Sequence, residues 1–424
     1  MNKYDLVIIG AGPAGYAAAM RAVDFKKKTL LIERNRLGGA GITNGALSSK
    51  TWWELSRETA SFRKSLNRYN IQAPQVAYTD VQSEVRRAVN ERKAMLEEHI
   101  HQLQRSRNDQ LLDLKYGQAK LLTPNRIEIL TGAQKEIVET DYVILATGSR
   151  PRYLPELPID EKVVMTSEGI ENMLDFPESM VIVGAGVIGC EYATIFSGFA
   201  KTKVNLIDKG DRILPFEDED VVRIIERNME NNGVLIHRNS RLIRMEIKNG
   251  RVEYELKYND HSREVFHVEK ALVSVGRVPN IENLWEDDVG INITKRGIED
   301  NDTQTNVPNI YAVGDLTADI SLVNVGELEG RYAVEKIFGK PERRLVYENI
   351  STIMFLSPEV AGVGLNEIQA REKGLDYKVV TLDYSTIPRA VAKRNTQGFI
   401  KLLVTNDADM KILGMKVIGL HASS

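Results

Sequence analysis

The first residues of the chain combine an apolar run, a glycine cluster and a second apolar run. Residues 4–9 are apolar enough for a buried strand, and glycines follow them at once. Residues 17–23 are small and favour a helix, and residues 29–32 form another apolar run that ends at Glu33. This order predicts a strand, a helix and a second strand within roughly thirty residues, which is the length of a βαβ unit.

The same order recurs in the middle of the chain. Residues 180–183 predict a strand, a glycine cluster and a helical stretch follow, and residues 204–207 predict a second strand that ends at Asp208. Strands that alternate with helices are typical of α/β domains built on parallel sheets. We therefore expect an α/β fold with two Rossmann-like dinucleotide-binding units, and this internal repeat is the main feature of the chain's organisation.

A long charged helix is predicted between the two units, over residues 79–104. We interpret it as a structural helix, with partner binding as the alternative reading. His99 and His101 are two positions apart on this helix and point in different directions, so we expect exposed residues rather than a pair of metal ligands. The apolar positions that support the helix are Val81, Val85, Val89 and Leu96.

Two later stretches have other patterns. Residues 251–267 alternate between polar and apolar positions, which predicts antiparallel strands. From about residue 346 the strand and helix patterns continue without glycine motifs, which indicates a separate C-terminal α+β domain. A chain of 424 residues has room for two to four domains.

Each glycine cluster follows the spacing G-x-G-x-x-G. The spacing alone is a weak signal, but a preceding strand, a following helix and an acid at the end of the next strand are typical of a dinucleotide site. The glycines let the backbone approach a pyrophosphate, which binds where the helix N-terminus offers unpaired N–H groups and a favourable dipole. A Rossmann-like unit that binds nothing is the alternative. The glycines are Gly10, Gly12, Gly15, Gly184, Gly186 and Gly189.

The acids at the strand ends, Glu33 and Asp208, are each expected to accept hydrogen bonds from a ribose. An acid at this place also repels a 2′-phosphate, so Asp208 favours NADH over NADPH. Lys209 and Arg212 follow closely enough in the sequence to weaken that preference. Two dinucleotide sites in one chain are most simply a flavin site and a nicotinamide site, and composition does not say which is which.

Composition narrows the classes of protein. The net charge of -3 gives neither the basic footprint of a nucleic-acid-binding protein nor an acidic tail. The one cysteine, Cys190, excludes an intramolecular disulfide and a cysteine-rich metal site, and we predict no metal. The first apolar run is too short for a signal peptide, and no run has the length of a membrane span. We therefore expect a soluble, cytoplasmic protein.

Motifs spread along the chain resemble those of the flavoprotein pyridine nucleotide-disulfide oxidoreductases. This family includes dihydrolipoamide dehydrogenase, glutathione reductase and soluble pyridine nucleotide transhydrogenase. The resemblance covers nearly the whole chain and keeps the family's order. It implies that the first unit binds FAD and the second binds NAD(H), with NADP(H) as the alternative. The motifs are GAGPAG with a later GG…SK (10–50), ATGS (146–149), VGAGVIGCEYA (183–193), GRVPN (276–280), TNVPNIYAVGD (305–315) and SPEVAGVG (357–364).

The resemblance also implies domain limits and an assembly. We expect an FAD-binding domain at residues 1–147 and 276–344, and an NAD(P)H-binding domain at residues 148–275. An α+β interface domain is expected at residues 345–424, truncated at its end. The family dimerises through this last domain, so we expect a homodimer.

Site residues are carried over from the family's motifs in two sets. Asp315 is expected on the ribityl chain of FAD, Arg277 near the flavin, and Gly117 with its two successors against the adenine half. For FAD the residues are Gly10, Gly12, Pro13, Ala14, Gly15, Glu33, Arg34, Gly39, Lys50, Gln118, Ala119, Thr147, Gly148, Ser149, Arg277, Gly314 and Asp315. For NAD they are Gly184, Gly186, Val187, Ile188, Gly189, Glu191, Asp208 and Gly276.

Lys50 and Glu191 match the family's ion pair beside the reactive flavin nitrogen, and the resemblance makes them the predicted catalytic residues. A buried lysine and a buried glutamate are each costly alone, so the retention of both argues that flavin chemistry is preserved. The alternative is an exposed lysine and a glutamate on a helix face.

The family pattern breaks in the segment 38–50, where two redox cysteines are expected and Gly41 and Ala46 stand instead. Disulfide exchange needs a thiolate and a second sulfur, so turnover of dihydrolipoamide is excluded. Cys190 is expected to be a small buried residue and no substitute. Small residues at positions 41 and 46 are expected to leave one face of the flavin open.

Two further departures in the same loop, Thr43 for the family's Asn and Ser48 for its Pro, indicate natural divergence rather than an engineered change. Val187 stands where some relatives carry a bulky gate, so we expect an unobstructed nicotinamide pocket. The family's C-terminal HPT-x-x-E segment is not matched: His421 resembles an earlier stretch, and the acid/base histidine is expected to be missing if the chain ends there.

These observations favour an FAD-dependent NAD(P)H oxidoreductase that works without a disulfide. Its partners would be a nicotinamide nucleotide and an unidentified small electron acceptor, for which we consider a quinone, a dye, oxygen or NADP. The stretch around Glu191 resembles soluble pyridine nucleotide transhydrogenase, but Asp208 argues against NADP. The alternative from another class is a dihydrolipoamide dehydrogenase homologue that serves as a non-catalytic FAD/NAD-binding subunit or sensor.

Overall fold

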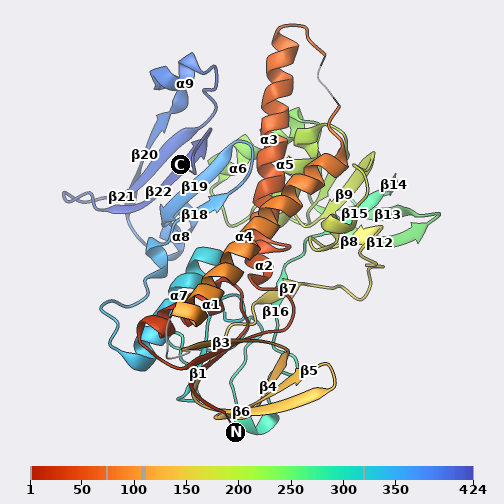
Figure 1. Cartoon of the computed structure of the whole chain (residues 1–424). Helices are drawn as coiled ribbons and strands as arrows, with labels where there is room; N and C mark the ends of the chain where they lie inside the picture. The colour runs from red at the N-terminus through yellow and green to blue at the C-terminus, as the bar shows by residue number, and fades with distance from the viewer. Residues whose placement is uncertain (1, 73–74, 107–110, 319, 424) are drawn as a thin grey trace. The chain divides into compact units, whose positions relative to one another are not determined.

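The computed structural model describes residues 2–72, 75–106, 111–318 and 320–423 (Figure 1). Its contacts divide the chain into two compact units. The first unit comprises Met1–Ser48, Val85–Arg150 and Arg277–Tyr347, and the second comprises Ser49–Glu84, Pro151–Gly276 and Glu348–Ser424. Two long helices, α3 (Ala46–Arg68) and α4 (Tyr78–Ser106), continue from one unit into the other.

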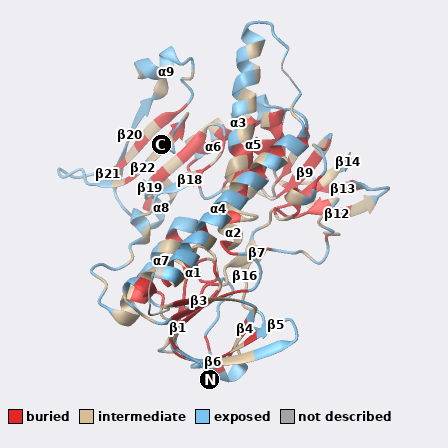
Figure 2. Ribbon diagram, viewed as in Figure 1, coloured by how far each residue is buried: buried red, intermediate tan, exposed pale blue. Residues whose placement is uncertain are grey.

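The core of the first unit is a sheet with the strand order β3-β2-β1-β6-β5-β4, to which β17 is added along β6. The predicted strands at residues 4–9 and 29–32 are confirmed as β1 and β2, whose side chains are largely buried because helices and loops cover both faces. Figure 2 shows β1 as mostly buried, whereas β5 and much of β6 are intermediate or exposed. The strands are β1 (Lys3–Ile9), β2 (Thr29–Glu33), β3 (Leu112–Tyr116), β4 (Gln118–Thr123), β5 (Arg126–Thr131), β6 (Gln134–Leu145) and β17 (Ile310–Ala312).

Two helices of the first unit, α1 (Pro13–Asp24) and α7 (Val323–Phe338), pack against each other at close range. A Cβ atom on Gly330 would lie only 2.2 Å from the carbonyl oxygen of Ala14, so glycine is needed where the two backbones meet. The predicted helix 79–104 is confirmed as α4, and its four apolar positions are buried. Shorter elements near this unit are α2 (Gly39–Ile42), the paired strands β7 (Ser149–Pro151) and β16 (Arg277–Pro279), and the 3₁₀ helix Asp287–Val289.

The second unit contains a parallel sheet with the order β11-β10-β9-β15-β8, so the second predicted βαβ unit is also confirmed. The strand pattern predicted over residues 251–267 is present as an antiparallel sheet, β12-β13-β14. The elements are β8 (Val164–Met165), β9 (Ser179–Val183), α5 (Val187–Phe199), β10 (Lys203–Ile207), α6 (Glu219–Asn231), β11 (Leu235–His237), β12 (Ser240–Lys248), β13 (Arg251–Tyr258), β14 (Arg263–Val268), β15 (Lys270–Val273) and the 3₁₀ helix Gly169–Asn172.

The C-terminal residues of the second unit form an antiparallel sheet with the order β18-β19-β22-β21-β20. Its edge strand β20 exposes apolar side chains, among them Val380 and Leu382. Ser424, the last residue of the predicted interface domain, lies outside the described residues. The elements are β18 (Thr352–Met354), β19 (Glu359–Gly364), α8 (Glu367–Glu372), β20 (Tyr377–Asp383), α9 (Pro388–Ala392), β21 (Phe399–Thr405), β22 (Ile412–Gly419) and the 3₁₀ helices Tyr347–Asn349 and Tyr384–Thr386.

Among the helices of the described residues, none combines the length and apolar character that a bilayer crossing requires.

A buried histidine makes the stability of the second unit depend on pH. His237, at the end of β11, is 7% exposed; its Nδ1 pairs with the Tyr258 hydroxyl at 2.8 Å. Its Nε2 has no hydrogen-bond partner among the described residues. Burial lowers the pKa of His237 below its ordinary value, and the carboxylate of Glu264 opposes this effect only in part. The folded state therefore disfavours the imidazolium, whereas the unfolded chain binds the proton freely.

We expect the free energy of unfolding to fall as pH decreases through the ordinary pKa of histidine, because the unfolded state then binds more protons than the folded state. His237→Gln should flatten this part of the profile in urea titrations between pH 8 and pH 5. His267→Gln is the matched control. His267 lies on β14 and is largely exposed, so its replacement should leave the pH profile unchanged. Equal slopes in the wild type and His237→Gln would contradict the assignment.

Candidate active site

The first glycine motif forms a tight turn between β1 and α1. Gly10 has a φ of +105°, and a Cβ there would lie 2.3 Å from the carbonyl oxygen of Ala146. A Cβ on Gly15 would lie 1.9 Å from the carbonyl oxygen of Gly10, so these two glycines are required by the turn itself. Gly12, the N-cap of α1, has open space beside it. The turn thus leaves room for a ligand at the helix N-terminus, as a bound pyrophosphate requires.

The second motif repeats this geometry between β9 and α5. Gly184 has a φ of +101°, a Cβ on Gly189 would lie 1.9 Å from the Gly184 carbonyl oxygen, and Gly186 has open space beside it. The turn is also held by Ser274, whose hydroxyl lies 3.0 Å from the Val183 carbonyl oxygen and 2.9 Å from that of Gly184. Ser274 was not predicted, because it follows strand β15 without any motif of its own.

The two acids at the strand ends have the same arrangement. Glu33 accepts hydrogen bonds from the backbone N–H groups of Ala11 at 2.8 Å and Asn35 at 2.7 Å. Asp208 accepts them from Ala185 at 2.9 Å and Gly210 at 2.7 Å. Each carboxylate is therefore fixed to its glycine turn. Since a carboxylate offers about four acceptor positions, each one retains capacity for ribose hydroxyls.

The two cations that follow Asp208 in the sequence are not arranged as partners for the 2′-phosphate of NADP. Lys209 is exposed, and the guanidinium of Arg212 donates to the carbonyl oxygen of Pro215 at 2.8 Å within its own loop. Of these three charged residues, Asp208 is the one whose side chain is held to the glycine turn by two backbone N–H groups.

Several other residues predicted for FAD surround the first glycine turn. A Cβ on Gly39 would lie 3.2 Å from the Cα of Gly12, and a Cβ on Gly314 would lie 3.2 Å from the Cβ of Ala14. The N–H of Gly117 donates to the carbonyl oxygen of Glu33 at 2.8 Å, which places the start of β4 beside that acid. Gln118 and Ala119 follow on β4, and Arg34 is exposed next to Glu33.

Asp315 is linked to the crossover strands by a short chain of hydrogen bonds. The Ser149 hydroxyl donates to Asp315 Oδ2 at 2.8 Å, and Arg277 donates to the same hydroxyl at 2.8 Å and to the Ser149 carbonyl oxygen at 2.7 Å. Thr147 and Gly148 are tied to Asn280: the Thr147 hydroxyl donates to its carbonyl oxygen at 2.7 Å. The structure therefore brings the ATG, GRxPN and GD motifs together in the first unit.

Another anchor of this region was not predicted. The carboxylate of Glu329 is 1% exposed; it accepts the N–H of Gly314 at 2.6 Å and the hydroxyl of Tyr347 at 2.9 Å. Glu329 thereby holds the residue before Asp315. An acid in the small-residue stretch of α7 was the signal available in the sequence.

Lys50 and Glu191, which are 141 positions apart in sequence, form an ion pair at 2.9 Å in the second unit. The lysine side chain is 31% exposed and the glutamate side chain 7% exposed. The other oxygen of Glu191 accepts the backbone N–H of Phe355 at 3.0 Å. The alternative of an exposed lysine and a glutamate on a helix face does not fit this pairing, because Glu191 is nearly buried and bound to Lys50. Beside the pair on α5, Val187 and Ile188 are half-buried, and Gly276 has a φ of +104° at the unit's limit.

The positions of the missing cysteines are not equivalent. A Cβ on Gly41 would lie 2.3 Å from the Cγ of Pro13, so the proline ring occupies the space that a side chain would need. A side chain at position 41 would therefore require the Pro13 ring or α2 to shift. Ala46 is the first residue of α3. Cys190 is fully buried, and burial, with the nearby charges of Asp208 and Glu191, raises the pKa of its thiol. This thiol is not poised for exchange.

Three carboxylates that could in principle hold a metal ion lie close together in the second unit, on Asp218, Asp220 and Glu367. The ammonium of Lys401, which is fully buried, donates to all three at 2.9, 2.7 and 2.8 Å. Burial works to lower the pKa of Lys401, but the three hydrogen bonds and charges raise it above its ordinary value. The cluster is therefore a lysine-centred salt bridge.

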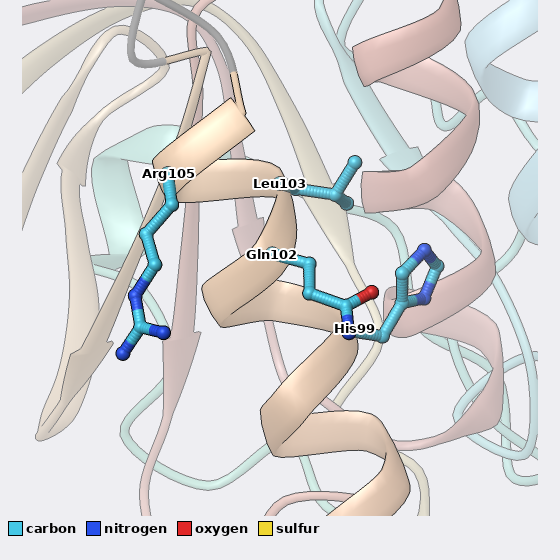
Figure 3. A pocket seen from close by; sticks show the side chains of 4 residues that line it. All are labelled: His99, Gln102, Leu103 and Arg105. Carbon is cyan, nitrogen blue, oxygen red and sulfur yellow. The ribbon is translucent and has the colours of Figure 1, made fainter.

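A surface pocket on α4 has no link to these motifs. It is lined by His99, Gln102, Leu103 and Arg105 (Figure 3). His99 is exposed, as expected, and its Nδ1 pairs with the Tyr16 hydroxyl at 2.5 Å. The histidine thus fastens α4 to α1.

Comparisons with known proteins agree with this architecture. Residues 4–330 match the family model described as pyridine nucleotide-disulphide oxidoreductase, and residues 350–424 match the dimerisation domain of the same family. Members of this family typically bind FAD and NAD(P). The expected α/β fold with two Rossmann-like domains and a C-terminal dimerisation domain is confirmed.

Several relatives are similar over nearly the whole chain. A dihydrolipoyl dehydrogenase of Bacillus subtilis (strain 168) is 32% identical over 98% of this chain and 88% of its own. One from Chlamydia muridarum is 32% identical over 100% of this chain and 89% of its own. The crystal structure of LpdA from Mycobacterium tuberculosis superposes with a TM-score of 0.89 at 23% identity, covering 100% of this chain and 91% of that one. This last likeness concerns the fold.

A structure with 25% sequence identity is the Cu(II) complex of the HOCl-induced flavoprotein disulfide reductase RclA from Escherichia coli, with a TM-score of 0.87. The match covers 100% of this chain and 91% of that one.

The glycines predict a clear difference between two substitutions in the second motif. Gly189→Ala should lower the melting temperature, because its Cβ would collide with the Gly184 carbonyl oxygen. Gly186→Ala should leave the melting temperature close to that of the wild type, since space is open there, and should weaken NADH binding about tenfold or more by blocking the approach of the pyrophosphate. Calorimetry and NADH titration measure the two effects. Equal melting temperatures for both variants would contradict the distinction.

Loss of the cluster's central cation should be strongly destabilising. Lys401→Met leaves three carboxylates without their counter-charge, so we expect a loss of about 3–5 kcal/mol in the free energy of unfolding. Lys411→Met, on an exposed lysine beyond β21, is the control and should cost less than about 1 kcal/mol. Urea titration of both variants checks this, and a small effect of Lys401→Met would disprove the structural role of the cluster.

Proposed function

The chain belongs to the pyridine nucleotide-disulphide oxidoreductase family, and from this premise we propose that it is an FAD-dependent NAD(P)H oxidoreductase that works without a redox disulfide. Bound FAD would supply the redox chemistry, namely the uptake of a hydride from NADH and the direct transfer of electrons to a second acceptor. A quinone, a dye, oxygen and NADP remain the candidates for that acceptor.

The observation that carries the proposal is the Lys50–Glu191 ion pair, formed at 2.9 Å between two distant parts of the sequence. A nearly buried carboxylate needs a partner, and the lysine supplies it. In the family that the sequence resembles, this pair serves the flavin, so its intact geometry supports flavin chemistry. We assign Lys50 the role of a fixed positive charge and Glu191 the role of holding it in place.

The two glycine turns fit the proposed cofactors. We assign FAD to the first turn, with Glu33 for its ribose and Asp315 for its ribityl chain, and NADH to the second turn. Asp208 cannot easily turn away from a 2′-phosphate, because two backbone N–H groups hold its carboxylate. The preference for NADH over NADPH follows from this restraint. It also argues against transhydrogenation, which needs NADP to bind.

The absence of a thiol at positions 41 and 46 supports a second candidate, a non-catalytic FAD/NAD-binding subunit or sensor. For either function we propose a homodimer formed through the C-terminal domain, whose match to the family's dimerisation domain supports it.

The proposal is tested by following the flavin absorbance of the purified protein during anaerobic titration with NADH and then with NADPH. We expect bleaching with about one equivalent of NADH, much weaker bleaching with NADPH, and reoxidation by one of the candidate acceptors. A bound flavin that neither nucleotide reduces would refute the oxidoreductase and leave the binding subunit.

The role of the ion pair can be tested in the same assay. Lys50→Met should slow flavin reduction on the order of 10²-fold, the size expected when one preorganised charge is removed from an active site. Lys64→Met changes an exposed lysine on the same helix and should leave the rate unchanged.

A further inference from the structure

Phe355, in the connection between β18 and β19, contacts both members of the Lys50–Glu191 pair. We propose that Phe355 is a positioning residue for this pair, which holds the Lys50 ammonium in one orientation through its ring and the Glu191 carboxylate through its backbone. This inference rests on the proposed function for its catalytic meaning. The contacts themselves belong to the second unit alone.

The two contacts come from different parts of the same residue. The N–H of Phe355 donates to Glu191 Oε1 at 3.0 Å, while Glu191 Oε2 accepts from Lys50 at 2.9 Å. The Lys50 Nζ also lies 4.8 Å from the centre of the Phe355 ring. Glu191 is therefore oriented by one oxygen and pairs with the other, and the ammonium lies between a carboxylate and an aromatic ring.

An aromatic ring suits this place for a physical reason. Its face carries partial negative charge and attracts a cation, more strongly where water is partly excluded. Lysine has a flexible four-carbon stem, so a carboxylate alone leaves its ammonium several orientations. The ring restricts these orientations without accepting a proton or forming a competing salt bridge.

Phe355 is itself held firmly. The Trp53 ring meets the Phe355 ring edge-to-face, with centroids 5.2 Å apart, and the Trp53 indole N–H donates to the Leu356 carbonyl oxygen at 3.2 Å. Trp53 is 3% exposed and Leu356 is 1% exposed. Since Lys50 and Trp53 are three residues apart on α3, they share one face of that helix. Helix α3 thus presents both the cation and the residue that fixes the ring.

The chain's own residues therefore make a three-part site: Lys50 from α3, Glu191 from α5 and Phe355 from the C-terminal sheet region. The third part was invisible in the sequence because no motif includes position 355. The geometry of the pair therefore depends on a residue that lies 164 positions beyond Glu191 in the sequence.

The first test uses NMR of the whole chain and needs no turnover. Reductive ¹³C-methylation labels the lysines, and the Lys50 signal is identified by its loss in Lys50→Arg. We expect this signal to be shifted upfield by the ring, to move toward the position of the exposed lysines in Phe355→Leu and Phe355→Met, and to keep its shift in Phe355→Tyr. Phe62→Leu, which changes an exposed ring on α3, is the control.

The second test measures the midpoint potential of bound FAD and its rate of reduction by NADH. Phe355→Leu should shift the potential and slow reduction roughly tenfold, in line with the strength of a partly desolvated cation–π contact. Phe355→Tyr, which keeps the aromatic ring, should leave both the potential and the rate of reduction at their wild-type values. Melting temperatures identify a variant that has lost its fold, and Phe355→Met, whose flexible unbranched side chain can fill an irregular space, then decides the outcome.

The results separate the two claims. If NADH does not reduce FAD in the wild type, the proposed function fails, while the Lys50 signal still tests the positioning role. If Phe355→Leu and Phe355→Met are folded and leave the Lys50 signal, the potential and the rate unchanged, the positioning role of Phe355 is refuted.

Discussion

The structure depends on the close contact of backbone with backbone at the two glycine turns. Gly15 and Gly189 each approach a carbonyl oxygen so closely that a single methyl group could not be accommodated. This contact sets the angle at which a helix leaves its strand, and hence where its free N–H groups point. The acids Glu33 and Asp208 then fasten the end of the next strand to the same turn. Both cradles are thus preorganised by the protein itself, so little ordering is left for a ligand to supply.

In the second unit, ion pairs centred on lysines of low exposure connect the region that follows the second glycine turn to the C-terminal sheet. Lys401 gathers carboxylates from α6 and α8, and Lys416 pairs with Glu217 at 2.7 Å. These contacts fix the end of the loop that follows Asp208, while Phe355 contacts the Lys50–Glu191 pair from the connection between β18 and β19. Buried ionic clusters of this kind add little net stability. They do restrict the positions of their members, because displacing one partner leaves a buried charge without its counter-charge. The C-terminal region is therefore part of the site's framework.

Much of this arrangement could be predicted from the sequence. The paired strands, the glycine turns, the acids at the strand ends and the helix 79–104 are encoded locally, by runs of apolar residues and by residues with special backbone freedom. The Lys50–Glu191 pair was accessible only through resemblance to a family, since no local pattern links positions so distant. Ser274, Glu329 and Phe355 were missed because their roles come from tertiary contacts that ordinary side chains and backbone groups make. The contact between Gly41 and the Pro13 ring is likewise tertiary, and no local pattern in the sequence indicates it.

The contact between Gly41 and Pro13 has a consequence for how two separate segments can vary. Any side chain at position 41 would meet the ring of Pro13, a residue of the first glycine turn, unless α2 or the ring shifts. The turn that leaves open space beside Gly12 therefore also restricts a residue almost thirty positions later to one without a Cβ atom. Positions 13 and 41 thus form one packing unit, and a larger residue at position 41 requires a matching change at position 13 or in the path of α2.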